Sequence, residues 1–327
     1  SAEVTERWNY EEGIKRPYFH VKALEKSQLQ NWKEYLEFET GRGNKERIIV
    51  LFERCLIACA LYEEFWLKYL YYLEGLNEID RIRDVYERAC TIHHMKKPNL
   101  HLKWSLFEEC EGNVDRAAQV LTNLDQAVPN ILQVAYRRIN LERRRHNTTK
   151  CCELFEHYIS NSTNKTIASN LAIKYSRFVL KIFKNLDRAV EILKEAMEKD
   201  AINPRLCLQI IDLSLHKEVL DENEITGYIN KFLANDEVDV EQKALFAQRK
   251  LEFLEDFGAD IHSVREAYDE YQTHCKSYKE MKRKRDEKNE NTTKKLKVDQ
   301  NSSLYNYAGY QAGPNGAYGP YPSQYGT

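Results

Sequence analysis

The chain has 327 residues, of which 42% are hydrophobic and 31% charged, and its formal net charge at pH 7 is −2. Only 12 glycines and 7 prolines are present, which argues against a sandwich or barrel of many short strands. No run approaches the roughly 20 uncharged apolar residues that a membrane helix needs. These totals favour a helix-rich protein with an extensive charged surface and no membrane segment.

The first residues and the cysteines bear on the cellular setting. The opening stretch, SAEVTERWNYEEG, is polar and charged, unlike a secretory signal, and begins with serine rather than methionine. We therefore expect a fragment whose natural N-terminal part is missing. The eight cysteines are scattered without a CxxC pair, so we expect reduced, buried thiols in an intracellular protein rather than a disulfide framework or a zinc site.

Internal repeats give the clearest structural signal. One set of markers follows at intervals of 34, 35 and 34 residues: Phe52, Tyr86, Leu121 and Phe155. A second set keeps the same intervals: Phe38, Tyr72, Phe107 and Leu141. The segments around the second set are NWKEYLEFE (31–39), FWLKYLYYLE (65–74) and LHLKWSLFEE (100–109). Those around the first set are VLFERCL (50–56), DVYERAC (84–90), QVLTNLD (119–125) and the weaker ELFEHYI (153–159), EILKEAM (191–197) and EAYDEYQ (266–272).

The sequence pattern within each repeat is typical of two helices joined by a turn. Apolar residues recur at spacings of three and four within both kinds of segment, which is helical spacing. The stretches between them, such as TGRGN (40–44), contain turn formers, and prolines come shortly before new pairs at Pro98, Pro129 and Pro204. We call the first helix of each pair the A helix and the second the B helix.

This pattern predicts an all-α fold, an α-solenoid of about seven helix pairs, because stacked neighbours bury faces that one pair cannot bury alone. We expect it to cover residues 1–275, with the end of a preceding repeat at 1–13 and units starting near residues 27, 61, 98, 129, 167, 204 and 239. Tyr71 lies off the buried face and is left free for a partner. The expected repeat core consists of Trp32, Tyr35, Phe38, Phe52, Trp66, Tyr69, Tyr72, Tyr86, Trp104, Phe107, Leu121, Phe155 and Phe178.

The repeat pattern ends near residue 275. Residues 276–300 are almost all polar and rich in lysine and arginine, and residues 301–327 are a mixture of Tyr, Gly, Pro, Gln and Ser. Neither segment has enough apolar surface to offset the entropy of ordering, so both are predicted to be disordered. The tail tyrosines are either sites of weak association or part of an inert end. The rest of the chain is acidic, which argues against an array that wraps phosphate backbone along its whole length.

Two basic clusters are candidate binding sites. Arginines near the end of one predicted helix suit an RNA phosphate or an acidic protein tail, or are a solvated helix end: Arg137, Arg138, Arg143, Arg144 and Arg145, with Lys150 nearby. Basic residues in the linker are typical of a nuclear localisation signal or a solubilising segment: Lys282, Arg283, Lys284, Arg285, Lys294, Lys295 and Lys297.

Other polar patterns favour structural roles. Glu53–Arg54 and Glu87–Arg88 are interpreted as ion pairs between units rather than as a partner-binding stripe. Adjacent His93–His94 and Cys151–Cys152 point about 100° apart on a helix and rarely share a metal ion. We find no GxSxG, Gly-rich phosphate loop or HExxH motif, so neither catalysis nor a cofactor is expected.

The aromatic A-helix segment followed by an F/Y-E-R-A/C segment resembles the tetratricopeptide-like half-a-tetratricopeptide (HAT) repeat. EEGIKRPYFHVKALEKSQLQNWKEYLEFE (11–39), LFERCLIACALYEEFW (51–66) and QRKLEFLEDFGAD (248–260) narrow the resemblance to the pre-mRNA-processing factor 39 family. It covers most of residues 7–275 and corresponds to that family's C-terminal part. The third B segment, and the fourth A segment at Ala135 and Arg138, depart from the pattern.

The resemblance implies a non-catalytic nuclear scaffold in pre-mRNA splicing, associated with the U1 small nuclear ribonucleoprotein (U1 snRNP) that recognises the 5′ splice site. It implies partners among U1 snRNP proteins and other splicing factors, and a homodimer or a heterodimer with a related HAT protein. RNA contact is secondary, and no small-molecule substrate is expected. The alternatives are a direct RNA-binding protein and a scaffold of 3′-end cleavage and polyadenylation. We predict that the dimer interface lies within residues 205–275 and includes Phe253, Phe257, Tyr268 and Tyr271.

Overall fold

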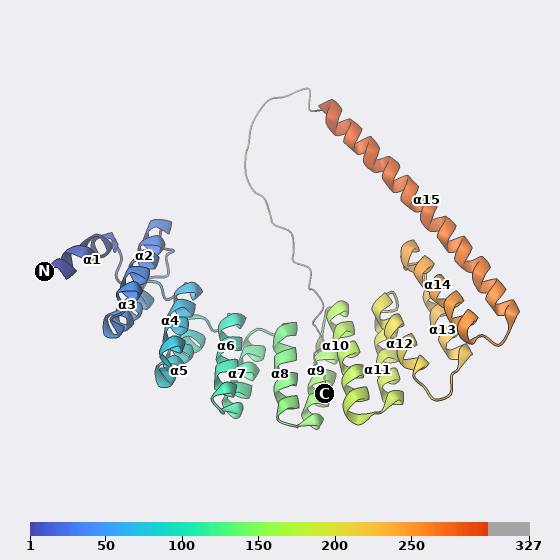
Figure 1. Ribbon diagram of the computed structural model, residues 1–327, viewed down its shortest axis with the longest axis horizontal. Coiled ribbons are helices and arrows are strands. Elements are labelled where there is room, and N and C mark those ends of the chain that lie inside the picture. Colours follow the sequence, from blue (N-terminus) through green and yellow to red (C-terminus); the bar gives the residue numbers. More distant parts are fainter. Residues whose placement is uncertain (300–327) are drawn as a thin grey trace. The chain divides into compact units, whose positions relative to one another are not determined.

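The computed structural model describes the backbone of residues 1–299 and the side chains of residues 1–292. All regular secondary structure within these residues is helical, which confirms the predicted fold class. The chain divides into an N-terminal unit, Ser1–Asp221, and a C-terminal unit that begins at Glu222. Within each unit, successive helices run back and forth as antiparallel hairpins (Figure 1). The Tyr-rich tail at 301–327 lies outside the described residues.

The N-terminal unit begins with a single helix, α1 (Ala2–Gly13), and ends with an unpaired A helix, α12 (Pro204–Leu215). Five A–B pairs lie between them, and two of their helices end in π-helical turns, η1 (Ala89–His93) and η2 (Val179–Phe183). The pairs are α2 (Lys26–Arg42) with α3 (Lys45–Ala58), α4 (Glu63–Leu76) with α5 (Ile79–Arg88), α6 (Pro98–Cys110) with α7 (Val114–Ala127), α8 (Leu132–Arg144) with α9 (Thr148–Asn161), and α10 (Lys165–Phe178) with α11 (Leu186–Lys199).

The C-terminal unit contains α13 (Glu222–Leu233), α14 (Val240–Phe257) and the long α15 (Ile261–Asp299). The first half of α15 runs antiparallel to α14, since Lys250 Nζ lies 2.8 Å from Glu270 Oε2 and the Tyr278 hydroxyl donates to Glu241 Oε1 at 3.4 Å. Beyond Tyr278, α15 continues past the start of α14, as Figure 1 shows.

Short polar residues at the helix ends explain where the hairpins turn. Asn44 and Asn147 cap α3 and α9, and each side-chain oxygen accepts a hydrogen bond from a first-turn N–H at 3.1 Å. Pro98 and Pro204 occupy first helical positions, where the missing N–H costs nothing. Gly43 ends α2 with a φ of 78°, a left-handed conformation that glycine adopts without strain.

The predicted repeat core lies between the stacked helices. Nine of its thirteen side chains are buried, namely Trp32, Tyr35, Phe52, Trp66, Tyr69, Tyr86, Trp104, Leu121 and Phe155. The other four, Phe38, Tyr72, Phe107 and Phe178, are half-buried against the same clusters. Rings of neighbouring helices stack on one another, with 4.9 Å between the Phe52 and Tyr69 centroids and again between Phe155 and Tyr175. Stacked rings of this kind add to the stabilisation that area burial provides.

One expectation needs correction. Residues 276–300 were predicted to be a disordered linker, but α15 continues through Asp299. Its sequence has no Gly or Pro and is rich in Lys, Arg and Glu, which are strong helix formers. The first half of α15 packs on α14 and so provides a formed helix, to which each further residue adds one backbone hydrogen bond without a new nucleation cost. The prediction of disorder considered only how much apolar surface these residues could bury, and it did not include the extension of a helix that is already formed.

Candidate interaction surfaces

A cluster of Tyr, Glu and Arg side chains connects successive repeats. Tyr69 of α4 donates its hydroxyl to Glu53 Oε1 of α3 at 2.9 Å. Arg88 of α5 donates to both oxygens of the same carboxylate, at 2.9 and 2.8 Å. Bidentate, charge-assisted bonds of this kind fix geometry as well as adding energy. The Glu of one B helix therefore holds both helices of the next pair.

The same Tyr–Glu–Arg cluster occurs at two other places in the N-terminal unit. Tyr35 donates to Glu11 at 2.7 Å, and Arg54 donates to the two Glu11 oxygens at 2.7 and 2.8 Å. Burial, together with the hydrogen bond to Glu11, raises the pKa of Tyr35. The third copy consists of Glu156, Tyr175 and Arg188. The Glu-Arg motif of the B helices thus contributes ion pairs between successive repeats. This agrees with the interpretation of Glu53 and Arg54 as structural residues.

Glutamates at the end of two A helices are buried with their charge compensated. The Glu108 side chain has no exposed surface and accepts from Arg83 Nε at 2.8 Å, from Asn113 at 2.9 Å and from Trp104 Nε1 at 3.3 Å. Burial acts to raise the pKa of Glu108, but these donors outweigh it, and the net pKa is lowered. Glu39 is buried in the same way and pairs with Arg7.

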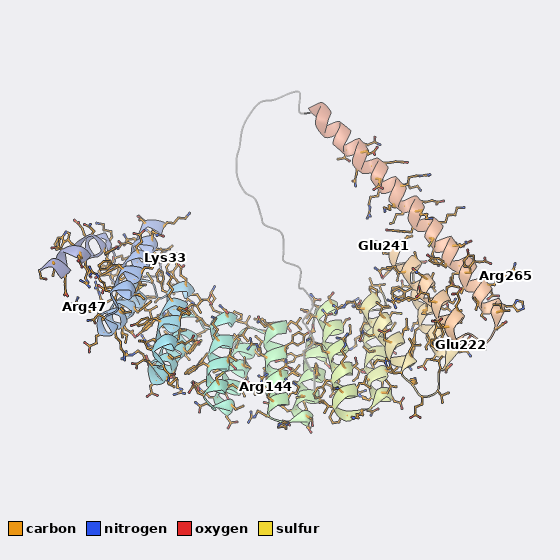
Figure 2. All side chains as sticks on the ribbon, in the orientation of Figure 1. Lys33, Arg47, Arg144, Glu222, Glu241 and Arg265 are labelled. Atoms are coloured by element: carbon orange, nitrogen blue, oxygen red, sulfur yellow. The ribbon has the colours of Figure 1, made fainter. Side chains whose placement is uncertain are left out.

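The predicted basic cluster on α8 is largely occupied by internal ion pairs. Arg144, labelled in Figure 2, donates to both carboxylate oxygens of Glu109 on α6, at 2.5 and 2.8 Å. Arg138 donates to Asp125 of α7 at 3.1 Å and to the Tyr158 hydroxyl at 2.7 Å. These arginines join α8 to its neighbours in the array.

The remaining members of the α8 cluster differ from one another in their contacts. Arg145 pairs with Asp115 of α7 and lies 3.5 Å from Glu142. Arg143 is exposed and its Nε lies 3.4 Å from Asn140 Oδ1, whereas Arg137 is half-buried. Arg137 and Arg138 lie in the middle of α8 and the other three arginines lie at its end, so the five do not form one open cationic patch.

The residues selected for dimerisation occupy unlike positions in the C-terminal unit. Phe253 is buried, with its ring centroid 5.7 Å from that of Phe257. Phe257 and Tyr268 are 55% and 47% exposed, and Tyr271 is half-buried. Phe253 therefore belongs to the core of this unit, while Phe257 and Tyr268 are available to a partner.

The proposed nuclear localisation residues lie on α15. Lys282, Arg283, Lys284 and Arg285 are exposed, and Arg283 Nε lies 3.8 Å from Glu287 one turn further on. Lys294, Lys295 and Lys297 belong to the same helix, but their side chains lie outside the described residues.

Reactive or metal-binding groups do not gather in the described part of the chain. No group of three His, Cys, Asp or Glu there could hold a metal ion, and no helix there is long and apolar enough to cross a membrane. Burial raises the pKa of Cys151 to about 11 and that of Cys207 to about 12, so both stay protonated and unreactive at neutral pH. His94 is buried, and its Nε2 lies 2.8 Å from the Ala60 carbonyl oxygen.

Two surfaces were not predicted as sites from the sequence, although Tyr71, which lines the first, was expected to be exposed. The first is a groove of about 960 Å³ beside the 81%-exposed Tyr71, whose lining includes Leu36, Leu67 and Lys103. The second belongs to residues 14–25, the strap, which connects α1 to α2 and reaches η1, where the ring centroids of Phe19 and His93 are 5.8 Å apart. The interleaved basic and aromatic residues of KRPYFHVK (15–22) were the available signal.

We call the second surface the basic–aromatic surface. It consists of the lysines and the Tyr and Phe rings of the strap, of His93 at the end of η1, and of the lysines that follow η1, all within four residues of Phe19 or His93 in the sequence. Its members are Lys15, Tyr18, Phe19, Lys22, His93, Lys96 and Lys97.

Comparison with known proteins agrees with this architecture. A family model described as PRP39 C-terminal HAT repeat matches residues 5–144. Pre-mRNA-processing factor 39 of Homo sapiens is 45% identical over 283 residues, which are 86% of this chain and 42% of the human protein. Pre-mRNA-processing factor 39-2 of Arabidopsis thaliana is 28% identical over 273 residues, 79% of this chain and 26% of that protein.

Among solved structures, a tetratricopeptide repeat protein from Parabacteroides merdae aligns at 13% identity with a TM-score of 0.34, over 74% of this chain and 99% of that one. The present chain spans only about two fifths of the length of its human relative. With 45% identity to that relative along most of its own length, the chain belongs to the pre-mRNA-processing factor 39 family and corresponds to the family's C-terminal HAT-repeat region.

Proposed function

We propose that this chain is a non-catalytic scaffold in pre-mRNA splicing. It supports U1 snRNP assembly or 5′ splice-site recognition through protein–protein contacts, and it needs no cofactor or small-molecule substrate. The observation that carries the proposal is the relationship to pre-mRNA-processing factor 39 along most of the chain. Stacked helix pairs fit this role because they expose extended surfaces on a rigid core.

Binding of RNA by the α8 arginines receives less support. Arg138, Arg144 and Arg145 already pair with carboxylates of neighbouring helices. A phosphate would have to displace those carboxylates before it could bind. Protein partners that bind the surface of the array are therefore favoured over RNA bound by the α8 arginines.

Capture from nuclear extract tests the scaffold role. The tagged 327-residue chain is incubated with extract that has been treated with ribonuclease, and the bound proteins are identified by mass spectrometry against a tag-only control. We expect U1 snRNP proteins to be enriched. Enrichment of cleavage and polyadenylation proteins in their place would support the alternative scaffold, and loss of all partners after ribonuclease treatment would mean that capture depends on RNA.

We also propose that the C-terminal unit mediates dimerisation, with an identical chain or a related HAT protein. Phe257 and Tyr268 are large exposed rings at the end of the chain's repeats. Exposed apolar side chains at the end of a repeat array are commonly covered by a capping element, and the helices of a second chain can serve as that cap.

Nuclear localisation is the third part of the proposal. The basic run from Lys282 to Arg285 is exposed on α15 and accessible to an import receptor. A fluorescent fusion of the full chain is expected to accumulate in nuclei. Replacement of the four basic residues by serine is expected to shift it to the cytoplasm, and unchanged nuclear accumulation would contradict the role of this run.

A further inference from the structure

We propose that the basic–aromatic surface binds single-stranded RNA, a role that goes beyond the protein–protein scaffold. The exposed strap rings would stack on bases, and the exposed lysines that flank Phe19 and His93 in the sequence would neutralise phosphates. Nucleic-acid sites of this type combine aromatic platforms with a positively charged track.

The strap is held in place by hydrogen bonds at both ends. Near its start, the Lys15 N–H donates to Gln28 Oε1 at 2.9 Å, and near its end the Leu24 N–H donates to the Tyr62 hydroxyl at 2.8 Å. Leu24 is buried in the same core as the first repeats. Between these points the Arg16 guanidinium donates to the Lys22 carbonyl at 2.6 Å. A strap tied in this way presents its rings with little further loss of conformational entropy on binding.

Two adjacent rings in the strap remain open to solvent. Tyr18 is 57% exposed, and Phe19 is 48% exposed although one side of its ring contacts His93. His93 in turn lies 5.6 Å from Trp66, a buried core ring, so Phe19 is backed by the array. Phe19 is therefore supported by structure beneath it, as a stacking platform requires.

The cations of this surface are not neutralised by the protein. Lys15, Lys22, Lys96 and Lys97 are exposed, and none of them forms an ion pair with a described residue, in contrast to the paired arginines of α8. Arg16 also contributes a positive charge, and its Nε is buried without a hydrogen-bond partner.

Charge and shape together favour RNA over an acidic peptide. An acidic peptide would use the lysines but would leave Tyr18 and Phe19 without a matched partner. Unpaired bases provide both a negative backbone and flat faces for the two rings. The surface is small, so we expect contact with only a few nucleotides and a strong dependence on salt.

Fluorescence anisotropy with a labelled single-stranded oligoribonucleotide tests the proposal on the full chain. The first variant, Tyr18→Ala with Phe19→Ala, removes the platform and is expected to weaken binding by about tenfold or more, since each stacked base contributes strongly. The second variant, Lys96→Ser with Lys97→Ser, is expected to weaken binding and to reduce the slope of log K against log salt by about 1.4, at about 0.7 per phosphate contact.

The matched control removes two positive charges near the other π-helical turn. Lys181 lies in η2 and Lys184 directly follows it, with a φ of 53° that asparagine tolerates. Lys181→Ser with Lys184→Asn should leave RNA affinity almost unchanged. Equal losses in this control and in the lysine variant would show general electrostatic attraction and overturn the proposal. Circular dichroism is used to check that each variant is folded. The single substitution Tyr18→Ala, at an exposed residue, provides a second measurement of what the rings contribute to RNA affinity.

Photocrosslinking with 4-thiouridine RNA locates the contact independently of affinity. We expect crosslinked peptides from residues 15–22 and 92–97. Crosslinks confined to α15, or binding of a polyglutamate peptide with no binding of RNA, would overturn the assignment. Because capture of U1 snRNP proteins is measured after ribonuclease treatment, failure of RNA binding and failure of the scaffold function give different results.

Discussion

At the scale of single residues, neighbouring aromatic rings on one helix have opposite fates. Trp66 is almost fully buried, and its Nε1 donates to the Ala60 carbonyl at 2.8 Å, whereas Tyr71 is 81% exposed. The helical period decides this, because positions three apart share a face and Tyr71 falls outside that series. Position within the repeat therefore tells more about the role of a ring than does residue type.

Substitution of the two rings tests this distinction. Trp66→Ala is expected to lower the free energy of unfolding by about 3–5 kcal/mol, because it leaves a large cavity between the packed helices. Tyr71→Ala, the matched control on the same helix, should change it by less than about 0.5 kcal/mol. Urea unfolding followed by circular dichroism measures both, and similar losses would contradict the assignment of faces.

The buried Glu108 predicts a pH-dependent contribution to stability. Its pKa is lowered in the folded protein, so the stability it contributes is complete above its unfolded pKa of about 4.3 and is lost as the pH falls through the folded-state value. Glu108→Gln is therefore expected to cost about 1–3 kcal/mol at pH 7 and progressively less below about pH 4.

Urea unfolding of both proteins across this pH range measures the difference. The exposed Glu198→Gln is the control and should show little effect at any pH. A cost of Glu108→Gln that stayed constant down to pH 3 would mean that the ionised carboxylate is not the stabilising form.

At the scale of elements, α15 shows how the environment divides one helix into two parts. Ala267 is buried against the C-terminal unit and Lys250 pairs with Glu270, whereas residues beyond Met281 are exposed as far as their side chains are described. The first part is stabilised by packing and the second by helix propensity and continuity. The two parts should therefore respond differently to the same disruption.

Proline substitution separates the two parts of α15. Gln272→Pro, in the packed part, is expected to cost about 3 kcal/mol or more and to reduce hydrogen-exchange protection in α13 and α14. Lys288→Pro, in the exposed part, should lower the helical circular dichroism signal yet leave that protection unchanged. Equal loss of protection in both variants would mean that the distal part also supports the unit.

At the scale of the whole molecule, the proposed dimer predicts a concentration-dependent mass. Sedimentation velocity of the full chain at micromolar concentration should show dimers, which Phe257→Ser with Tyr268→Ser should reduce by removing exposed rings. Tyr71→Ser removes a still more exposed ring from the other unit and should have no effect. A clean monomer of the unsubstituted chain would show that the proposal is wrong.

The sequence alone determined the helical class, the repeat and its register. Large apolar residues recur at helical spacing within each segment and again from one repeat to the next, and they can be buried only if each helix packs against a neighbouring helix. It also sufficed for the family, since the same rings and Glu-Arg pairs provide the resemblance. The tertiary structure decided which charges are used internally: Arg144 binds Glu109, 35 positions away, and Phe253 joins a core. Such pairings depend on which side chains meet across the stack, and spacing along the chain does not encode them. The basic–aromatic surface emerged for the same reason, since only folding places the strap beside η1.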